Sequence, residues 1–341
     1  MGTPAEILDA LLRSSMERGA SDIHLKVPSE PLMRIDGALV RVHALGTVTP
    51  ALTESCLASM LAGLTHSAKQ VEFESRGEVD FTVAHAGLGR FRVNAYRQRG
   101  SITLVLRPVP FTVPRLDALG LPEEVEELAG AQSGLVLVCG PAGSGVTTTI
   151  AALIDRMNDG PARSIITVED PIEVLHSDRG CAINQREVGL DTASFADSLT
   201  RVLRQDPDVV MIGSLHDRRT LEIALDAVAS GVLVIAAMST ADASETVERL
   251  VALVPPHRQA AVRTGLGVAL RAVVCQRLAP GPDGTGRRPE VRMVSGADRL
   301  GALALTAGAG GYGEEAGPDP LVEECSRPDA IAVGSPTATS R

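Results

Sequence analysis

The spacing of hydrophobic positions predicts a helix at the start of the chain. Residues 3–18 read TPAEILDALLRSSMER, in which Thr3 and Glu6 have the spacing of a capping box. The apolar stripe at helical spacing consists of Ile7, Leu8, Leu11 and Leu12, with Ser15 on the same face. This pattern predicts an amphipathic helix that ends before Gly19.

Alternating apolar and polar positions dominate the rest of the first 110 residues. The alternating segments are SDIHLKV, PLMRIDGALVRV, VDFTVAHAGLGRFRVNAYRQ and SITLVLRPV, separated by Pro and Gly turns. A further helical stretch is predicted near residues 53–63. Because alternation is typical of strands with one buried face, residues 1–110 are predicted to form an α+β domain.

Further along, the pattern changes to continuous apolar runs that are followed by helical sequence. The runs are GLVLVCG, SIITVED, DVVMIGS and VLVIAAMST, and strands buried on both faces of a parallel sheet have this character. We therefore predict a linker over residues 111–120 and a doubly wound α/β domain over residues 121–280. Residues 281–341 are rich in Gly, Pro and Ala and are predicted to be a largely flexible tail, with at most a short strand at EVRMV.

Composition and charge exclude several classes of protein. The 341 residues are 44% hydrophobic and 22% charged, which rules out a coiled coil, a collagen-like fibre and a fully disordered chain. With a net charge of −10 and only 2% aromatic residues, we expect no direct nucleic-acid partner. The five cysteines lack metal-ligand spacing and are expected to be reduced thiols. Without a signal peptide or a bilayer-spanning apolar run, the chain is expected to be cytoplasmic.

A glycine-rich turn between an apolar run and a helical segment is the clearest candidate for chemistry. The phosphate-binding pattern G-x-x-x-x-G-K-[ST] is met at Gly140, Gly145 and Thr147, whereas Val146 occupies the lysine position. Backbone N–H groups of such a turn bind phosphate, and the Thr147 hydroxyl would bind Mg²⁺. The candidate nucleotide-binding residues are Gly140, Pro141, Ala142, Gly143, Ser144, Gly145, Val146, Thr147 and Thr148. A glycine-rich turn without a ligand is the alternative interpretation.

The segments around this turn carry a resemblance to a known family. ITVEDPIEVLH, INQREVG, DVVMIGSLHD and SGVLVIAAMST, together with SDIHL, RIDG and GRFRVNAYRQRG, resemble the PilT-like branch of the type II/IV secretion ATPases, the hexameric motors that retract type IV pili. The resemblance runs from about residue 5 to about residue 280. It implies a PAS-like N-terminal domain joined to a RecA-like P-loop domain, six copies in a ring, and ATP or ADP between domains of neighbouring subunits.

Four positions depart from the motifs of that family. Besides Val146, the Walker B segment G-E-x-R-D reads GSLHD, so that Ser214 replaces the glutamate. The family's His box reads SGVLVIAAMST here, with Val232 and Ser239 at the two histidine positions. Losing the lysine contact, about 1.5–3 kcal/mol, would weaken nucleotide binding by roughly one to two orders of magnitude. Because the family brings all four positions to one pocket, we expect weak or no ATP hydrolysis.

Charged residues of the family are partly retained. Glu169 and Glu173 are candidate catalytic residues that would polarise water, although they could instead cap a following helix and pair with arginines. The resemblance also implies that a group of arginines reaches the nucleotide of the neighbouring subunit, whereas a solvated strand face is the alternative. These arginines are Arg90, Arg92, Arg97 and Arg107.

Three functions are consistent with these residues. The first is a degenerate PilT-like protein of the type IV pilus (twitching motility) or a related secretion machine. It would be an accessory or regulatory subunit of a homo- or hetero-hexamer, with the pilus inner-membrane platform protein as its partner, in the cytoplasm or at the inner face of the cytoplasmic membrane. The second is an active retraction motor in which Arg163, Arg186, Arg201 or Arg204 replaces the lysine. The third is a scaffold without nucleotide. The family's A-I-R-N-L-I-R-E motif is absent after residue 280, which argues against motor output.

Overall fold

The chain forms two compact units in the computed structural model. The structure describes residues 3–35, 37–43, 46–64, 68–110, 112–281 and 287–306. The first unit comprises Met1–Val113 with Ile166–Arg201, and the second comprises Pro114–Ile165 with Val202–Arg341. This division assigns an internal segment to the first unit, and the predicted domain limits at residues 110, 120 and 280 stay a prediction.

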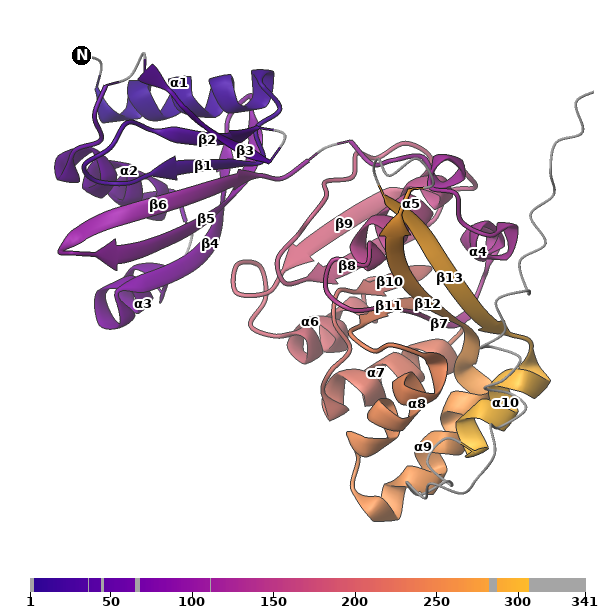
Figure 1. The fold of residues 1–341 in the computed structure, drawn as a ribbon. Helices are drawn as coiled ribbons and strands as arrows, with labels where there is room; N and C mark the ends of the chain where they lie inside the picture. Colours follow the sequence, from indigo (N-terminus) through magenta and orange to yellow (C-terminus); the bar gives the residue numbers. More distant parts are fainter. Residues whose placement is uncertain are drawn as a thin grey trace, which may run out of the picture. The chain divides into compact units, whose positions relative to one another are not determined.

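The first unit contains, among its described residues, a six-stranded sheet in the order β3-β2-β1-β6-β5-β4 (Figure 1). Neighbouring strands are antiparallel. The strands are β1 Asp22–Leu25, β2 Leu32–Ile35, β3 Ala38–Arg41, β4 Glu78–His85, β5 Gly89–Gln98 and β6 Ser101–Pro108. Buried and less buried positions alternate along most of β5, as the sequence predicts for a strand with one buried face.

Three helices accompany this sheet. They are α1 Pro4–Glu17, α2 Pro50–Ala62 and α3 Ala68–Arg76. The predicted capping box of α1 is confirmed, because the Glu6 N–H donates to the Thr3 hydroxyl and the Thr3 N–H donates to the Glu6 carboxylate. Leu11 and Leu12 are almost fully buried in the unit's core, which accounts for the apolar stripe in the sequence.

The second sheet has seven strands among the described residues, in the order β13-β12-β7-β11-β10-β8-β9. β7 pairs in parallel with β11 and β12, and β10 pairs in parallel with β11, so the predicted parallel arrangement is confirmed for these strands. The strands are β7 Gly134–Cys139, β8 Ser164–Glu169, β9 Ala182–Glu187, β10 Val209–Ile212, β11 Leu233–Met238, β12 Leu270–Pro280 and β13 Arg287–Ser295. The boundary between the two units falls within β8.

Helices of the second unit pack against this sheet and against each other. α5 Val146–Asn158 and α7 Arg218–Ala229 both contact β7 and β11. α9 Pro256–Ala269 packs against α7 and against α8 Ala243–Ala252. The remaining helical segments are η2 Leu116–Ala118, α4 Glu123–Glu127, η3 Leu128–Gly130 and α6 Phe195–Val202, of which α6 lies at the boundary between the units.

Part of the segment predicted to be a flexible tail has regular structure. β13 pairs antiparallel with β12 along nine residue pairs and includes the predicted strand EVRMV. A helix that the sequence analysis did not predict, α10 Ala297–Thr306, follows it and buries Leu300 and Ala304. Residues 282–286 and 307–341 of the predicted tail lie outside the described residues. None of the described helices is both long and apolar enough to cross a membrane.

Candidate nucleotide-binding site

Three segments meet at one edge of the sheet in the second unit. β7 and β10 each run parallel to β11, so the carboxyl ends of these strands point the same way. The segments that follow them begin at Gly140, Gly213 and Ser239. Ligands of open α/β sheets bind outside the carboxyl ends of the strands, which makes this edge the candidate site.

The phosphate loop after β7 has the backbone of a glycine-dependent turn. Gly143 and Gly145 adopt φ angles of +79° and +87°, in the left-handed region that disfavours other residues. The Ser144 N–H donates to the Pro141 carbonyl over 3.0 Å, and Gly145 is the N-cap of α5. The turn therefore leads directly into a helix of 13 residues, whose N-terminus carries partial positive charge.

The residues of this loop fit the phosphate groups of a nucleotide. Pro141, Ala142 and Gly143 are exposed, and Thr147 and Thr148 in the first turn of α5 are half-buried. Ser144 is 4% exposed, and its hydroxyl has no hydrogen-bond partner among the described residues. A buried polar group without a partner is one that a bound ligand or ordered water satisfies.

Val146 is the one loop position that does not fit a nucleotide. It is the first residue of α5, half-buried, and occupies the place of the lysine in the phosphate-binding pattern. A valine side chain neither donates a hydrogen bond nor carries charge, so binding at the loop would depend on backbone N–H groups and hydroxyls.

The segment after β10 holds Ser214 where the pattern has a glutamate. The Ser214 hydroxyl lies 3.1 Å from Nδ1 of His216. Asp217, the nearest acid in this segment, is the N-cap of α7 and accepts from the Thr220 N–H over 2.9 Å. Burial alone would raise the pKa of Asp217, but the hydrogen bonds from Thr220 lower it overall. Asp217 is thus committed to capping, and Ser214 is neutral.

The two altered His-box positions lie at opposite ends of β11. Val232 immediately precedes this strand and is buried, whereas Ser239 follows its last residue and is exposed. Seven residues of extended chain separate two positions by roughly 23 Å at about 3.3 Å per residue. The expectation that all four altered positions share one pocket is therefore wrong within a single chain. Val146, Ser214 and Ser239 lie at the carboxyl ends of the parallel strands, at the same edge of the sheet as the phosphate loop. Val232 lies at the opposite edge.

The first of the two candidate catalytic acids, Glu169, is buried at the end of β8 in the first unit. Its Oε1 accepts from the Thr167 hydroxyl over 2.6 Å and from the Gln185 amide over 3.0 Å. Burial, the largest influence, raises the pKa of Glu169 above its ordinary value, and these two hydrogen bonds offset only part of that rise.

The second acid, Glu173, has a side chain that is 44% exposed and lies 3.5 Å from Arg92. The described segment between β8 and β9 contains no helix, so the interpretation that these acids cap a following helix is wrong. Pairing of Glu173 with an arginine, the other half of that interpretation, is confirmed.

All four arginines of the expected inter-subunit group have partners within the first unit. Arg90 pairs with buried Glu187 over 3.1 Å, and Arg92 donates to the Ile172 carbonyl over 3.1 Å. Arg107 donates two hydrogen bonds to Asp22, and Arg97 stacks over the Phe73 ring at 5.0 Å. Their role toward a neighbouring subunit stays a prediction.

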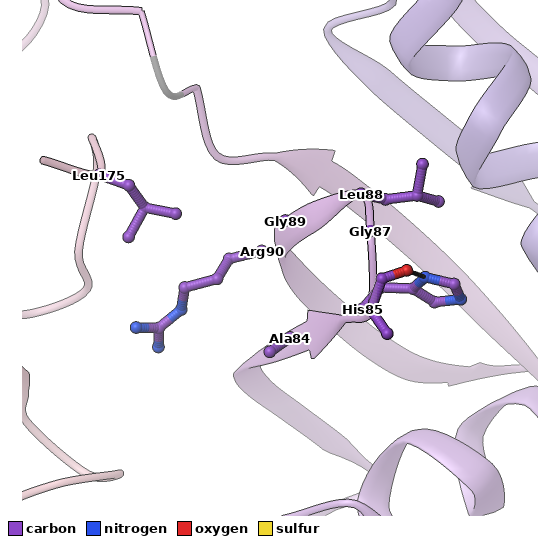
Figure 2. Close-up of a pocket in the computed structure, with 8 residues that line it drawn as sticks. Ala84, His85, Gly87, Leu88, Gly89, Arg90 and Leu175 are labelled. Atoms are coloured by element: carbon purple, nitrogen blue, oxygen red, sulfur yellow. Dashed lines mark hydrogen bonds between the residues drawn. The ribbon is translucent and has the colours of Figure 1, made fainter. Parts of the chain in front are cut away.

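An open hollow of about 570 Å³ lies beside Arg90 (Figure 2). It is lined by the turn between β4 and β5, from Ala84 to Arg90, and by Leu175. Figure 2 shows the Arg90 side chain extending away from the turn toward the segment that carries Leu175. The hollow contains none of the predicted nucleotide-binding residues.

Gln276 of β12 contacts the phosphate loop, although no motif in the sequence indicates it. Its side chain is 5% exposed and makes hydrogen bonds to Ser144 and Thr149. In the sequence, Gln276 is a polar residue that directly follows the apolar residues AVVC in the segment LRAVVCQRLAP. A buried polar side chain needs a partner, but the sequence does not say which one.

Comparison with known proteins decides the family. A family model described as type II/IV secretion system protein matches residues 2–293. The chain belongs to this family. Among its relatives, the type IV pilus ATPase PilU of Pseudomonas aeruginosa is 37% identical over 286 residues, which cover 84% of this chain and 74% of that protein. The type IV pilus retraction ATPase PilT of the same organism is 37% identical over 268 residues, covering 79% of this chain and 76% of PilT.

Solved structures of the type II/IV secretion family agree with this assignment. A crystal structure of the pilus retraction motor PilT with bound ADP matches with a TM-score of 0.78 and 37% identity, covering 87% of this chain and 86% of that one. The X-ray structure of the Legionella pneumophila ATPase DotB matches with a TM-score of 0.76 and 25% identity. The expected fold class, an α+β N-terminal domain followed by a RecA-like P-loop domain, is confirmed by these likenesses.

Proposed function

We propose that this chain is a pilus-type ATPase-family subunit that binds ATP or ADP weakly and hydrolyses ATP slowly or not at all. The observation that carries the proposal is a phosphate loop with its glycine backbone and hydroxyls retained, but with Val146 and Ser214 in place of a lysine and a glutamate. Without these two charges, neither the phosphates nor an attacking water is held by a charged side chain at those positions.

We propose further that the protein acts as an accessory or regulatory member of a ring. The relatives PilT and PilU are named as pilus ATPases, and surfaces between subunits can persist after catalysis is lost. The ring would be a homo- or hetero-hexamer with PilT-like subunits and would face the pilus inner-membrane platform protein from the cytoplasmic side. Mg²⁺ would accompany the nucleotide at the Thr147 hydroxyl.

Two of the four arginines named as substitute cations have partners away from the loop, so the alternative of an active motor rests on Arg201 or Arg204. Arg163 donates to the Ala131 carbonyl over 2.9 Å, and Ala131 lies just before the amino end of β7, opposite the phosphate loop. Arg186 of the first unit donates to the Asp191 carbonyl over 3.0 Å. Both arginines are thus engaged with backbone carbonyls elsewhere.

Mg²⁺-dependent ATP turnover of the purified full-length protein tests the proposal. We expect a rate far below that of a PilT measured alongside it, with little further change in Glu173→Gln. A rate equal to that of PilT, lost in Glu173→Gln, would contradict the proposal. Sedimentation of the chain alone and mixed with PilT tests the ring. Sedimentation of this chain with a hexamer in either sample supports the ring, and sedimentation of this chain as a monomer in both opposes it.

A further inference from the structure

The side chain of Gln276 joins the phosphate loop to the first part of helix α5. Its Nε2 donates to the Ser144 carbonyl over 2.8 Å, and its Oε1 accepts from the Thr149 hydroxyl over 2.7 Å. Ser144 lies in the loop and Thr149 lies one turn into α5. A single buried amide therefore fixes the distance between the loop and the helix that follows it.

The orientation of this amide is determined by its partners. A carbonyl oxygen accepts but never donates, so the Ser144 carbonyl requires the NH₂ group of Gln276 to face it. The carbonyl end of the amide then faces Thr149, whose hydroxyl supplies a proton. Neither glutamate nor leucine offers this combination of one donor and one acceptor.

The two glycines at the ends of the loop lie directly against Gln276. A methyl group at Gly145 would be 2.8 Å from Nε2 of Gln276, nearer than real contacts of that kind. A methyl group at Gly140 would collide with the backbone carbonyl of Gln276 and with the Ser144 side chain. The missing side chain at Gly145 thus leaves room for the Gln276 amide, and the one at Gly140 lets the loop approach the backbone of β12.

We propose that Gln276 is a positioning residue that holds the phosphate loop in its anion-binding form before any ligand arrives. This inference rests on the proposed nucleotide binding at the same loop. Because the loop is already ordered, binding does not require ordering it, which raises affinity for a given set of contacts. This gain in affinity matters more here than in a loop with a lysine at position 146, because Val146 supplies no charge and backbone N–H groups must make most of the phosphate contacts.

Two measurements on the full-length protein test this role, each with Gln276→Leu and with Thr149→Val. The first is an equilibrium titration with ADP and Mg²⁺, and the second is amide hydrogen exchange over residues 140–149 without nucleotide. Gln132→Leu is the matched control, since Gln132 is exposed and its amide donates to the nearby Gly130 carbonyl over 3.2 Å, away from the phosphate loop. We expect Gln276→Leu to weaken ADP binding about tenfold and to accelerate exchange in the loop, with smaller changes for Thr149→Val and none for Gln132→Leu.

The outcomes separate this role from general stability and from the proposed function. Wild-type ADP affinity and wild-type loop exchange in a folded Gln276→Leu protein would overturn the inference. If Gln276→Leu does not fold, Thr149→Val decides, because valine matches threonine in shape and removes one hydrogen bond; unchanged loop exchange would overturn the inference. If the unaltered chain binds no ADP, the proposed nucleotide binding fails, while faster loop exchange in either variant still supports positioning by Gln276.

Discussion

The loop after β7 and the segment after β10 lie at the same edge of one sheet, yet they differ in what they retain. The loop after β7 keeps its left-handed glycines and its contact with Gln276. The segment after β10 keeps the helix cap at Asp217 but has Ser214 in place of the acid. Features that the fold needs are present in both segments, whereas Val146 and Ser214 stand where the family pattern has a lysine and a glutamate.

The difference has a physical origin in what each group does for stability. Glycines, caps and a buried amide satisfy the backbone and the core, so replacing them costs folding free energy. A lysine at position 146 or a glutamate at position 214 would place a charge at a half-buried position outside the core, where it adds little to stability. If the protein does not need to hydrolyse ATP, we therefore expect the two charged side chains to be lost while the glycines, the helix cap and the buried amide are kept.

The largest effect is expected from restoring both charges together. In Val146→Lys/Ser214→Glu, we expect Mg²⁺-dependent ATP turnover to rise by about 10²- to 10⁴-fold, because the lysine neutralises the phosphates and the carboxylate assists the attacking water. Steady-state phosphate release measures this rise. Val146→Met/Ser214→Gln, which has similar volumes and no charge, is the control. Equal rates for the two double variants would mean that the missing charges do not limit hydrolysis.

A methyl group at Gly140 should destabilise the backbone conformation of the phosphate loop. Gly140→Ala is expected to lower the free energy of unfolding by about 1–3 kcal/mol, because the new Cβ collides with Gln276 and Ser144. Urea denaturation measures this loss. Gly130→Ala is the matched control, since no other atom lies within 4 Å of its added methyl group. Equal losses in the two variants would show that the close approach at Gly140 is not a constraint.

The lysine position alone should affect binding more than stability. We expect Val146→Lys to bind ADP roughly 10- to 100-fold more tightly than the unaltered chain, because a charge-assisted contact contributes about 1.5–3 kcal/mol. Isothermal titration calorimetry with ADP gives the ratio. Val146→Met provides an apolar side chain of comparable length. If the methionine variant gains as much affinity as the lysine variant, the missing charge is not the cause of weak binding.

The smallest effect concerns pH and Glu169 in the first unit. Because burial raises the pKa of Glu169 in the folded state, the folded protein holds this proton more tightly than the unfolded chain. Its contribution to stability is therefore largest below the ordinary pKa of glutamate and falls as pH rises through the folded pKa. Glu169→Gln should remove this decline, so that its free energy of unfolding rises relative to that of the unaltered chain as pH increases.

Urea denaturation of both proteins between pH 4 and pH 8 checks this prediction. Glutamine can keep the two hydrogen bonds that reach Oε1, those from Thr167 and Gln185, but its NH₂ group cannot accept from the Glu173 N–H. That loss is the same at every pH, so the change of stability with pH is the readout. Asp170→Asn, at the neighbouring exposed position, is the control. A stability difference between Glu169→Gln and the unaltered chain that stays constant over the whole pH range would contradict a raised pKa.

The elements of the fold were largely predictable from sequence because they depend on local spacing. The capping box at Thr3 and Glu6, the alternation along β5 and the apolar runs of β7 and β11 each report a buried face directly. Helix α10 was missed because residues 281–341 as a whole are rich in Gly, Pro and Ala, which outweighed the three leucines within the helix. In the structure α10 is held by packing on α9. Tertiary contact determines such a segment more than propensity does.

The candidate site was only half predictable for a related reason. Its glycines and the altered lysine position lie in one continuous motif, which can be found in the sequence from the spacing of these residues. The contact of Gln276 with Ser144 joins residues 132 positions apart and depends on the pairing of β12 with β7. The placement of Val232 at the far end of β11 likewise follows from strand direction and length, which a family motif does not state.

Equilibrium titration of the unaltered protein with ADP, in the presence of Mg²⁺, tests most directly whether the phosphate loop still binds nucleotide without the lysine and the glutamate. The structure of the loop predicts saturable binding, with a dissociation constant in the millimolar range or tighter. Absence of saturation at millimolar ADP, in a sample that is folded by circular dichroism, would contradict the account and leave a scaffold that binds no nucleotide.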